Sequence, residues 1–376
     1  MEITASMVKQ LREMTGAGVM ACKNALVETE GDFDAAVEVL RKKGEATAVK
    51  KAGRIAAEGT VLAYVDGNKA AIVEVNSETD FVAKNDTFRT FVADIAEQII
   101  ASDATTVEAL SEEKFIKDES KTVKEELVSK IAVIGENLTI RRFDKIDTDG
   151  VVVPYIHAGG KIGVLVEAAT ANTGDDVKEA LKNIAMQIAA LSPKFATKEE
   201  ISADELDKMR EITIESALND TFTLPAPILK GLLEKAANVW GAEDVAVYEE
   251  KKNDKYLVNF LSKEAKAALA EIAVADKAEI VENKIFLGLV DGRMKKQLKD
   301  MCLLEQTYVK AEDGKQTVAQ YIAEVAKATG SELTLKKFVR FETGEGIEKK
   351  EENFAEEVAK QINGSLLLSV KLNKES

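Results

Sequence analysis

The side chains that most often perform chemistry are scarce in this sequence. His157 is the single histidine of the 376 residues, and the two cysteines, Cys22 and Cys302, lie far apart. A nucleophilic triad would need the histidine beside a hydroxyl or thiol, and a zinc site would need several nitrogen or sulfur ligands at short spacing. Neither arrangement is present, so the sequence predicts no catalytic residue and no metal site. His157 is then a turn residue that bonds its own backbone or an interface residue, and both interpretations stay open.

Phosphate-binding motifs are missing as well. A P-loop requires serine or threonine directly after its glycine and lysine. Residues 160–162 read Gly-Lys-Ile and residues 314–316 read Gly-Lys-Gln, so neither segment fits. Residues 344–346 read Gly-Glu-Gly and are too short for a dinucleotide-binding loop. We therefore expect a protein without a cofactor, which is not an enzyme and acts by binding a partner.

Composition limits the choice of partner. The chain has 51 basic and 66 acidic residues, a net charge of -15, and nucleic-acid phosphates repel such a chain unless it carries a concentrated basic patch. The basic stretch 41–54 has no aromatic residue for base stacking, which favours a solvated linker or a protein-docking segment. No apolar run reaches the roughly 18 residues that a membrane span needs, and residues 1–4 do not resemble a signal peptide. We expect no direct contact with nucleic acid, no membrane segment and a reduced, cytoplasmic location.

A short loop is the strongest candidate for a binding site. Residues 71–75 alternate and are rich in β-branched side chains, which predicts a strand. The run from Thr87 to about Ile100 has the apolar spacing of a helix. Between these two elements, the carboxylate of Asp80 and the aromatic ring of Phe81 are adjacent in the sequence.

The aromatic ring of this loop has two interpretations. In the first, Asn85 or Asp86 caps the following helix. Phe81 or Val82 then packs under the first turn of that helix as a hydrophobic staple, and local sequence favours this because a loop aromatic usually belongs to a core. In the second, Phe81 is a wedge offered to a partner and Asp80 is its polar guide, since aromatic anchors dominate protein interfaces.

The elements around the loop begin with a small helical bundle. Three short helices are expected near the N-terminus, over 4–14, 19–28 and 33–43. Asp32 caps the third of these helices and Gly44 ends it. A bundle of this size has a thin core, so we expect residues 1–54 to form a docking module on a basic tether.

The core contains an internal repeat. Three segments recur in the same order: 69–75 and 161–167, 95–101 and 184–190, and 122–143 and 317–338. Each copy reads as a hairpin, then helices, then a returning strand, and two such halves would share one core. We therefore expect an α+β fold, with one half over 55–150 and the other over 151–345.

The second half is longer than the first, and the added chain is mostly helical. Two charged segments, 199–218 and 278–305, are expected to pair as a helical hairpin that projects from the core. Between them lies an insertion at about 221–277. Three elements are expected inside it: helices around Leu229 and over 265–275, and a strand over 256–260.

Six motifs of the chain are recognisable as a set. They are TGAGVMACKNAL (15–26), TDFVAKND (79–86), IGENLTIRRF (134–143), YIHAGGKIGVLVE (155–167), DGRMKKQ with CLLEQTYVK (291–310) and RFETGEGIEK (340–349). Together they resemble the family of elongation factor Ts, the nucleotide-exchange partner of the translational GTPase elongation factor Tu. They follow the order of the family and cover nearly the whole chain, so the resemblance is specific.

The resemblance implies an architecture. An N-terminal three-helix module like a ubiquitin-associated domain would precede two related α+β halves, a projecting helical hairpin and a C-terminal helical module over 346–376, with its helix over 354–362. Two features depart from the family pattern. One is the insertion at 221–277, where a typical relative connects the hairpin helices tightly, and we expect it to leave the function intact. The other is Val19, where relatives often carry methionine and the shorter side chain would weaken a contact.

The resemblance also implies guanine-nucleotide exchange on elongation factor Tu. Asp80 and Phe81 would reach the partner near its magnesium site, where the ring wedges between two helices and dislodges the ion. Thr79 and Val82 would hold the loop. Further contacts to the partner would come from Arg12, Val19, Met20, Ile134, Gly135 and His157. The second half and the C-terminal helix would brace another domain of the partner.

Two other functions stay open at this point. The protein could be a non-catalytic scaffold or chaperone that binds a partner helix on its N-terminal module. It could also be an enzyme whose site lies in the insertion, although the charged residues there have the spacing of solvated helix faces. Release of labelled GDP from elongation factor Tu would separate these functions from exchange.

Overall fold

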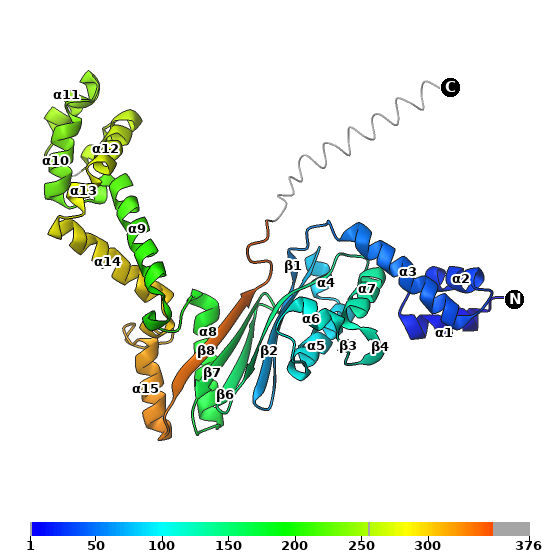
Figure 1. Ribbon diagram of the computed structural model, residues 1–376. Coiled ribbons are helices and arrows are strands. Elements are labelled where there is room, and N and C mark those ends of the chain that lie inside the picture. The colour runs from blue at the N-terminus through cyan, green and yellow to red at the C-terminus, as the bar shows by residue number, and fades with distance from the viewer. Residues whose placement is uncertain (1, 255, 349–376) are drawn as a thin grey trace, which may run out of the picture. The chain divides into compact units, whose positions relative to one another are not determined.

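The computed structural model describes residues 2–254 and 256–348 (Figure 1). The chain divides into two compact units. The first, called here the core unit, contains the chain up to Ala189 together with the chain from Lys337 on, and the second, called the helical unit, runs from Ala190 to Lys336. Helices and antiparallel sheets both occur in the described residues, which confirms the predicted α+β class. The finer domain boundaries given above stay a prediction.

The core unit begins with three helices, α1 (Ala5–Thr15), α2 (Val19–Glu28) and α3 (Phe33–Lys51). The Asp32 side chain caps α3 as expected, but the predicted end at Gly44 is wrong, because α3 continues to Lys51. Gly44 lies inside the helix at a close packing contact, since an added Cβ there would stand 3.6 Å from both Ala132 and Val128. The basic stretch expected as a linker is therefore largely the second part of α3.

A first antiparallel sheet follows. It consists of β1 (Glu58–Asp66), β2 (Lys69–Ser77) and β5 (Thr139–Asp147), in the order β1-β2-β5. The chain between β2 and β5 forms α4 (Asp80–Ala83), α5 (Asp86–Ala101), α6 (Val107–Glu112), the small pair β3 (Lys114–Phe115) and β4 (Asp118–Thr122), and α7 (Val123–Ile134). Helix α5 buries Phe88, Phe91 and Ile95 in a shared core with the inner face of β2.

A second three-stranded sheet has the same strand order as the first, β6-β7-β8. Strands β6 (Val151–His157) and β7 (Ile162–Ala169) form a hairpin, and β8 (Thr334–Glu342) returns to pair with β7. Helix α8 (Asp175–Leu191) follows the hairpin. The two hairpins share buried side chains, among them Val61, Ile72 and Leu165. Burial of apolar surface from both hairpins in one cluster stabilises their packing.

The helical unit contains the projecting helices and the insertion. Its helices are α9 (Ala203–Asn219), α10 (Ala226–Ala236), α11 (Ala242–Lys251), α12 (Lys263–Ala275), α13 (Lys277–Ile280), α14 (Lys284–Met301) and α15 (Val318–Thr329). The predicted helices over 199–218, around Leu229, over 265–275 and over 278–305 are confirmed in type. The strand predicted over 256–260 is wrong, because Leu257–Asn259 forms a single 3-10 turn. The Asp254 carboxylate accepts the N–H of Tyr256 at 2.7 Å and starts that turn locally.

The insertion shares its core with the hairpin helices. Leu232, Trp240 and Leu269 of the insertion belong to one buried cluster with Leu218 of α9 and Phe286 of α14. The indole N–H of Trp240 donates to the carbonyl of Ala265 at 2.9 Å, so this buried polar group is satisfied. The segment 221–277 is thus no separate body within the helical unit.

Two expectations concern the rest of the chain. The C-terminal module at 346–376 and its helix over 354–362 lie almost entirely outside the described residues. Among the helices of residues 2–254 and 256–348, none has both the length and the apolarity that a membrane crossing requires.

Candidate protein-binding site

The ring of Phe81 is exposed to solvent. Its exposed fraction is 80%, the highest value among the large hydrophobic side chains of the described residues. The neighbouring Val82 is 9% exposed and packs into the core beneath α5. Asn85 is the cap of α5, since its side-chain oxygen accepts the N–H of Thr87 at 2.9 Å. The staple position of the first interpretation is therefore filled by Val82, and Phe81 is left free.

The short helix α4 is held at its N-cap residue, Thr79, by a carboxylate from another part of the chain. Glu136 accepts the backbone N–H of Thr79 at 3.0 Å and the hydroxyl of Thr79 at 2.7 Å. The same hydroxyl oxygen accepts the N–H of Val82 at 3.4 Å and caps α4. The hydroxyl of Ser77 donates to the carbonyl of Thr79 at 2.9 Å. Thr79 and Val82 thus fix the segment that presents Phe81.

A second carboxylate makes the reciprocal contact. Glu78, which precedes the loop, accepts the backbone N–H of Asn137 at 2.6 Å. Arg54 pairs with Glu78 at 3.4 Å, and its carbonyl accepts the side-chain amide of Asn137 at 2.8 Å. The loop and the segment 136–137 therefore hold each other from both sides.

Asp80 provides a negative charge beside the exposed ring. The ammonium group of Lys84 lies 2.7 Å from its carboxylate. This hydrogen bond, with the positive charges of Lys84 and Lys161, lowers the pKa of Asp80 below its ordinary value. Asp80 is therefore ionised at neutral pH, and its side chain is about half exposed.

Two of the other predicted residues, Ile134 and Gly135, lie at the end of α7 directly before Glu136. Gly135 ends the helix in a left-handed conformation with φ of 85°. Its carbonyl oxygen accepts a hydrogen bond from the ammonium group of Lys51, the last residue of α3. Ile134 is half-buried against the core, and Gly135 is exposed. The structure thus brings these two residues to the anchor of the loop.

His157 is the last residue of β6, directly before the turn to β7. Its ring is exposed, and its Nδ1 lies 3.0 Å from the hydroxyl of Tyr155, so the hydrogen bond of the ring goes to a side chain and not to its own backbone. The turn packs on β1, where the carbonyl of Gly160 accepts the N–H of Val61 at 2.7 Å. Helix α4 also packs on β1, so this turn and the loop lie against the same strand of the core unit.

The remaining three predicted residues form a separate surface. Arg12 is in the last turn of α1, and Val19 and Met20 begin α2. All three are exposed, Met20 to 64%. Helices α1 and α2 pack on α3, and α3 in turn packs on α7. The packing of α3 on α7 connects these residues to the segment that anchors the loop.

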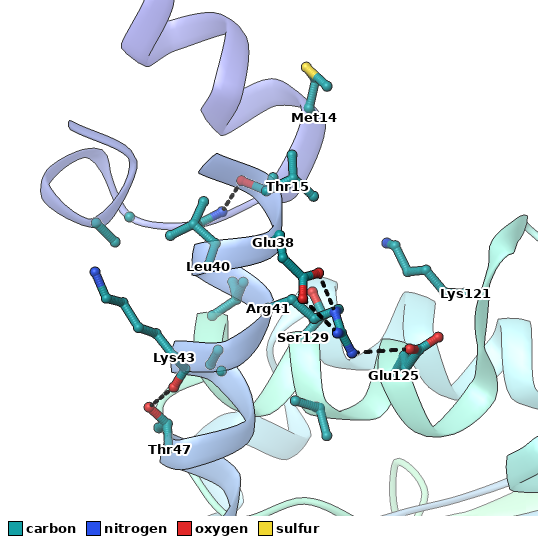
Figure 2. Close-up of a pocket in the computed structure, with 18 of the residues that line it drawn as sticks. Met14, Thr15, Glu38, Leu40, Arg41, Lys43, Thr47, Lys121, Glu125 and Ser129 are labelled. Atoms are coloured by element: carbon teal, nitrogen blue, oxygen red, sulfur yellow. Dashed lines mark hydrogen bonds and ion pairs between the residues drawn. The ribbon is translucent and has the colours of Figure 1, made fainter. Parts of the chain in front are cut away.

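A cavity of about 710 Å³ opens where the N-terminal helices meet α7 and β4 (Figure 2). Met14 and Gly18 line it, next to the predicted contact residues. Arg41 of α3 joins its two sides, because the guanidinium lies 2.9 Å from Glu38 and 3.4 Å from Glu125 of α7. The hydrogen bond from Arg41 lowers the pKa of Glu38 to about 2. The cationic Arg41 is thus already paired with carboxylates of the cavity wall.

Sequence reasoning missed a buried carboxylate, Glu74 in the centre of β2. It is fully buried, and its oxygens accept from Arg141 at 3.0 Å, Arg142 at 2.6 Å and the N–H of Gly344 at 2.7 Å. Burial alone would raise the pKa of Glu74, but the hydrogen bonds from Gly344, Arg141, Arg142 and Asn76 outweigh it and the pKa is lowered. The adjacent arginines in the IGENLTIRRF motif were the available signal. Across residues 2–254 and 256–348, no group of three or more histidine, cysteine or acidic side chains is arranged to hold a metal ion.

Comparison with known proteins gives a consistent result. The sequence profile of the family described as "Elongation factor TS" matches residues 78–345. Similar curated proteins include "Elongation factor Ts" of Clostridium kluyveri, 43% identical over 96% of this chain and 99% of the relative. The proteins of the same name from Clostridium novyi and Clostridioides difficile are 45% and 43% identical, again over 96% of this chain and 99% of each relative.

The matched range covers nearly the whole of this chain and of each of these relatives. The profile match over most of the chain, together with relatives matched over nearly their full length, shows that the chain belongs to the elongation factor Ts family.

Proposed function

We propose that this protein is the guanine-nucleotide exchange factor of elongation factor Tu. In this proposal it binds the GDP-bound GTPase, displaces its magnesium ion and promotes GDP release so that GTP can bind. Membership of the elongation factor Ts family supports this role. The observation that carries the mechanism is the exposed ring of Phe81, on a helix whose neighbouring residues are anchored in the core.

The displacement is a mechanical step. The ring of Phe81 enters between two helices of the partner near its magnesium site, and Asp80 accompanies it as the polar group. A bound magnesium ion neutralises nucleotide phosphates, so its loss raises the rate at which GDP leaves. The exchange factor makes and breaks no covalent bond, and it needs no cofactor.

The energy of exchange comes from differential binding. The factor weakens nucleotide binding by the same amount as the nucleotide weakens binding of the factor. A weakening of about 10⁴-fold corresponds to about 5.5 kcal/mol of differential contact energy. A few well-buried anchors can supply energies of that size at a protein interface.

The other predicted residues make supporting contacts with the partner. Ile134, Gly135 and His157 bind the partner next to the loop, in line with their positions at the ends of α7 and β6. Arg12, Val19 and Met20 bind the nucleotide domain of the partner from the N-terminal helices. The second half of the chain and the C-terminal helix bind another domain of the partner.

A second candidate function is a scaffold or chaperone that binds a partner helix without nucleotide release. The exposed Val19 and Met20, next to the cavity in Figure 2, favour a helix-binding surface on the N-terminal helices. Such a protein would bind elongation factor Tu and leave the lifetime of bound GDP unchanged.

One experiment separates these functions. Elongation factor Tu is loaded with fluorescent GDP, mixed with excess unlabelled GDP, and the loss of fluorescence is followed with and without this protein. Exchange predicts a rate of release that rises with the concentration of the protein and then saturates. Binding to elongation factor Tu with an unchanged release rate would reject exchange and support the scaffold.

A further inference from the structure

We propose that Glu136 is a positioning residue for exchange, which sets the direction of the Phe81 ring through Thr79. The inference rests on the proposed exchange function and adds a residue to which the family resemblance gave no role. Glu136 follows the end of α7 and lies 57 positions from Thr79 in the sequence, so the contact between them is a product of the fold.

The geometry of the contact fixes an orientation. One carboxylate oxygen of Glu136 accepts the N–H of Thr79 at 3.0 Å, and the other accepts the hydroxyl of Thr79 at 2.7 Å. Two directional bonds to one residue define both the plane of its peptide and the rotation of its side chain. Because the hydroxyl proton of Thr79 points to Glu136, the hydroxyl oxygen of Thr79 is free to accept the N–H of Val82 and close the first turn of α4.

Apolar packing alone would not give this control. Val82 and Ala83 bury their side chains and hold α4 on the core, but hydrophobic contact is non-directional. The ring of Phe81 is 80% exposed and has little packing of its own in the free protein. Its direction therefore follows from the backbone of α4, and the backbone is oriented at Thr79.

The contact requires a carboxylate of this length. A glutamine at position 136 has a single acceptor oxygen and no charge, so it can accept only one of the two bonds. Its amide nitrogen would have to donate to the Thr79 hydroxyl oxygen, which already accepts the N–H of Val82. An alanine removes both bonds and leaves the N–H and hydroxyl of Thr79 without their protein partner. The neighbouring bond between Glu78 and the N–H of Asn137 would remain in both variants and keep the loop attached to the core.

The expected effect is on the rate of exchange at saturation. With Glu136→Ala, the ring samples several directions, and we expect the maximal rate of GDP release to fall about tenfold, equivalent to about 1.4 kcal/mol. The concentration for half-maximal release should change less than threefold, because the other contacts of the interface are intact. The maximal rate of GDP release with Glu136→Gln should lie between those of the wild type and Glu136→Ala. Glu119→Ala, at an exposed glutamate of β4, is the matched control and should behave as wild type.

A double-mutant cycle tests the proposed route through the ring. If Glu136 acts by directing Phe81, Glu136→Ala should add nothing to Phe81→Ala, and the double variant should release GDP at the rate of Phe81→Ala alone. Thermal unfolding of each variant shows whether the fold is kept. If Glu136→Ala does not fold, Thr79→Val removes the hydroxyl bond from the other side and replaces it in the same cycle.

Three outcomes would overturn the inference. One is a wild-type maximal rate for Glu136→Ala. Another is a maximal rate of GDP release that Glu136→Ala lowers by the same factor with and without the Phe81 ring, which would mean an action independent of that ring. A third is a change confined to the half-maximal concentration, which would make Glu136 an ordinary contact or stability residue. Failure of the wild-type protein to accelerate GDP release would instead reject the exchange function itself, so the two failures are distinguishable.

Discussion

Truncation of Phe81 should separate stability from function. The ring is 80% exposed in the free protein, so Phe81→Ala removes little buried surface. Surface substitutions of this kind change the free energy of unfolding by about 0.5 kcal/mol or less. The variant should therefore unfold at nearly the wild-type temperature.

The cost of the same substitution appears when the partner is bound. Full burial of a phenylalanine side chain is worth about 1.5–3 kcal/mol, and truncation of an aromatic anchor at an interface costs about 2 kcal/mol or more. A loss of about 2 kcal/mol is about 30-fold in rate. This is about a third of the roughly 5.5 kcal/mol that a 10⁴-fold weakening of nucleotide binding requires.

The assay is fluorescent GDP release from elongation factor Tu at saturating factor, with thermal unfolding measured in parallel. Val92→Ala is the matched control, because Val92 is buried in α5 outside the loop and its truncation should lower stability by about 1–3 kcal/mol. Folded Val92→Ala should retain the ring and most of the exchange rate. A Phe81→Ala variant that exchanges at the wild-type rate, or that unfolds as easily as Val92→Ala, would refute the reasoning.

Three further predictions concern the fold that carries the loop. Glu74→Gln should lower the free energy of unfolding by about 3 kcal/mol at neutral pH, because it disrupts a buried ionic network. Since the pKa of Glu74 is lowered in the folded state, its carboxylate stabilises the fold above the unfolded pKa. That contribution disappears as pH falls through the folded pKa, so wild type and Glu74→Gln should converge in acid denaturation profiles; a constant difference would contradict this. Gly344→Ala should cost at least about 2 kcal/mol in chemical denaturation, because φ is +74° and the new Cβ would lie 2.1 Å from the carbonyl of Ala57; near-wild-type stability would show that the turn can move. Trp240→Ala should destabilise the helical unit by about 3–5 kcal/mol in calorimetry and leave GDP release by the folded protein unchanged, and a loss of exchange would place the insertion in the interface.

Deletion of residues 221–277 would be a less direct test of the insertion. The segment shares a core with Leu218 and Phe286 of the hairpin helices, so a simple deletion would expose these side chains and confound loss of contact with loss of fold. Trp240→Ala probes the same segment without opening the whole core.

The loop was predictable because its signals are local. The alternating strand before it and the cap at Asn85 are properties of adjacent residues, and both are present in the structure. The choice between Phe81 and Val82 was not predictable locally, since both are apolar and adjacent. In the structure Val82 faces the core beneath α5, and Phe81 is therefore the exposed residue.

The supports of the loop were not predictable because they connect distant residues. Glu136 reaches Thr79 across 57 positions, and the N–H of Gly344 reaches Glu74 across 270 positions. The interior position of Gly44 has the same origin, because only the contact with α7 explains why a helix continues through a glycine. Sequence periodicity reports the preference of each segment, and such tertiary contacts override it.

The most direct test of the account places a photoreactive azidophenylalanine at position 81, where it is close to the native ring in size. The variant is mixed with GDP-bound elongation factor Tu, irradiated and analysed by mass spectrometry. A variant with the same residue at Val239, an exposed position of the helical unit, is the control. The account predicts a crosslink from position 81 to the region of elongation factor Tu that holds the magnesium ion and the nucleotide. GDP release at the normal rate with crosslinks from position 239 and none from position 81 would contradict it.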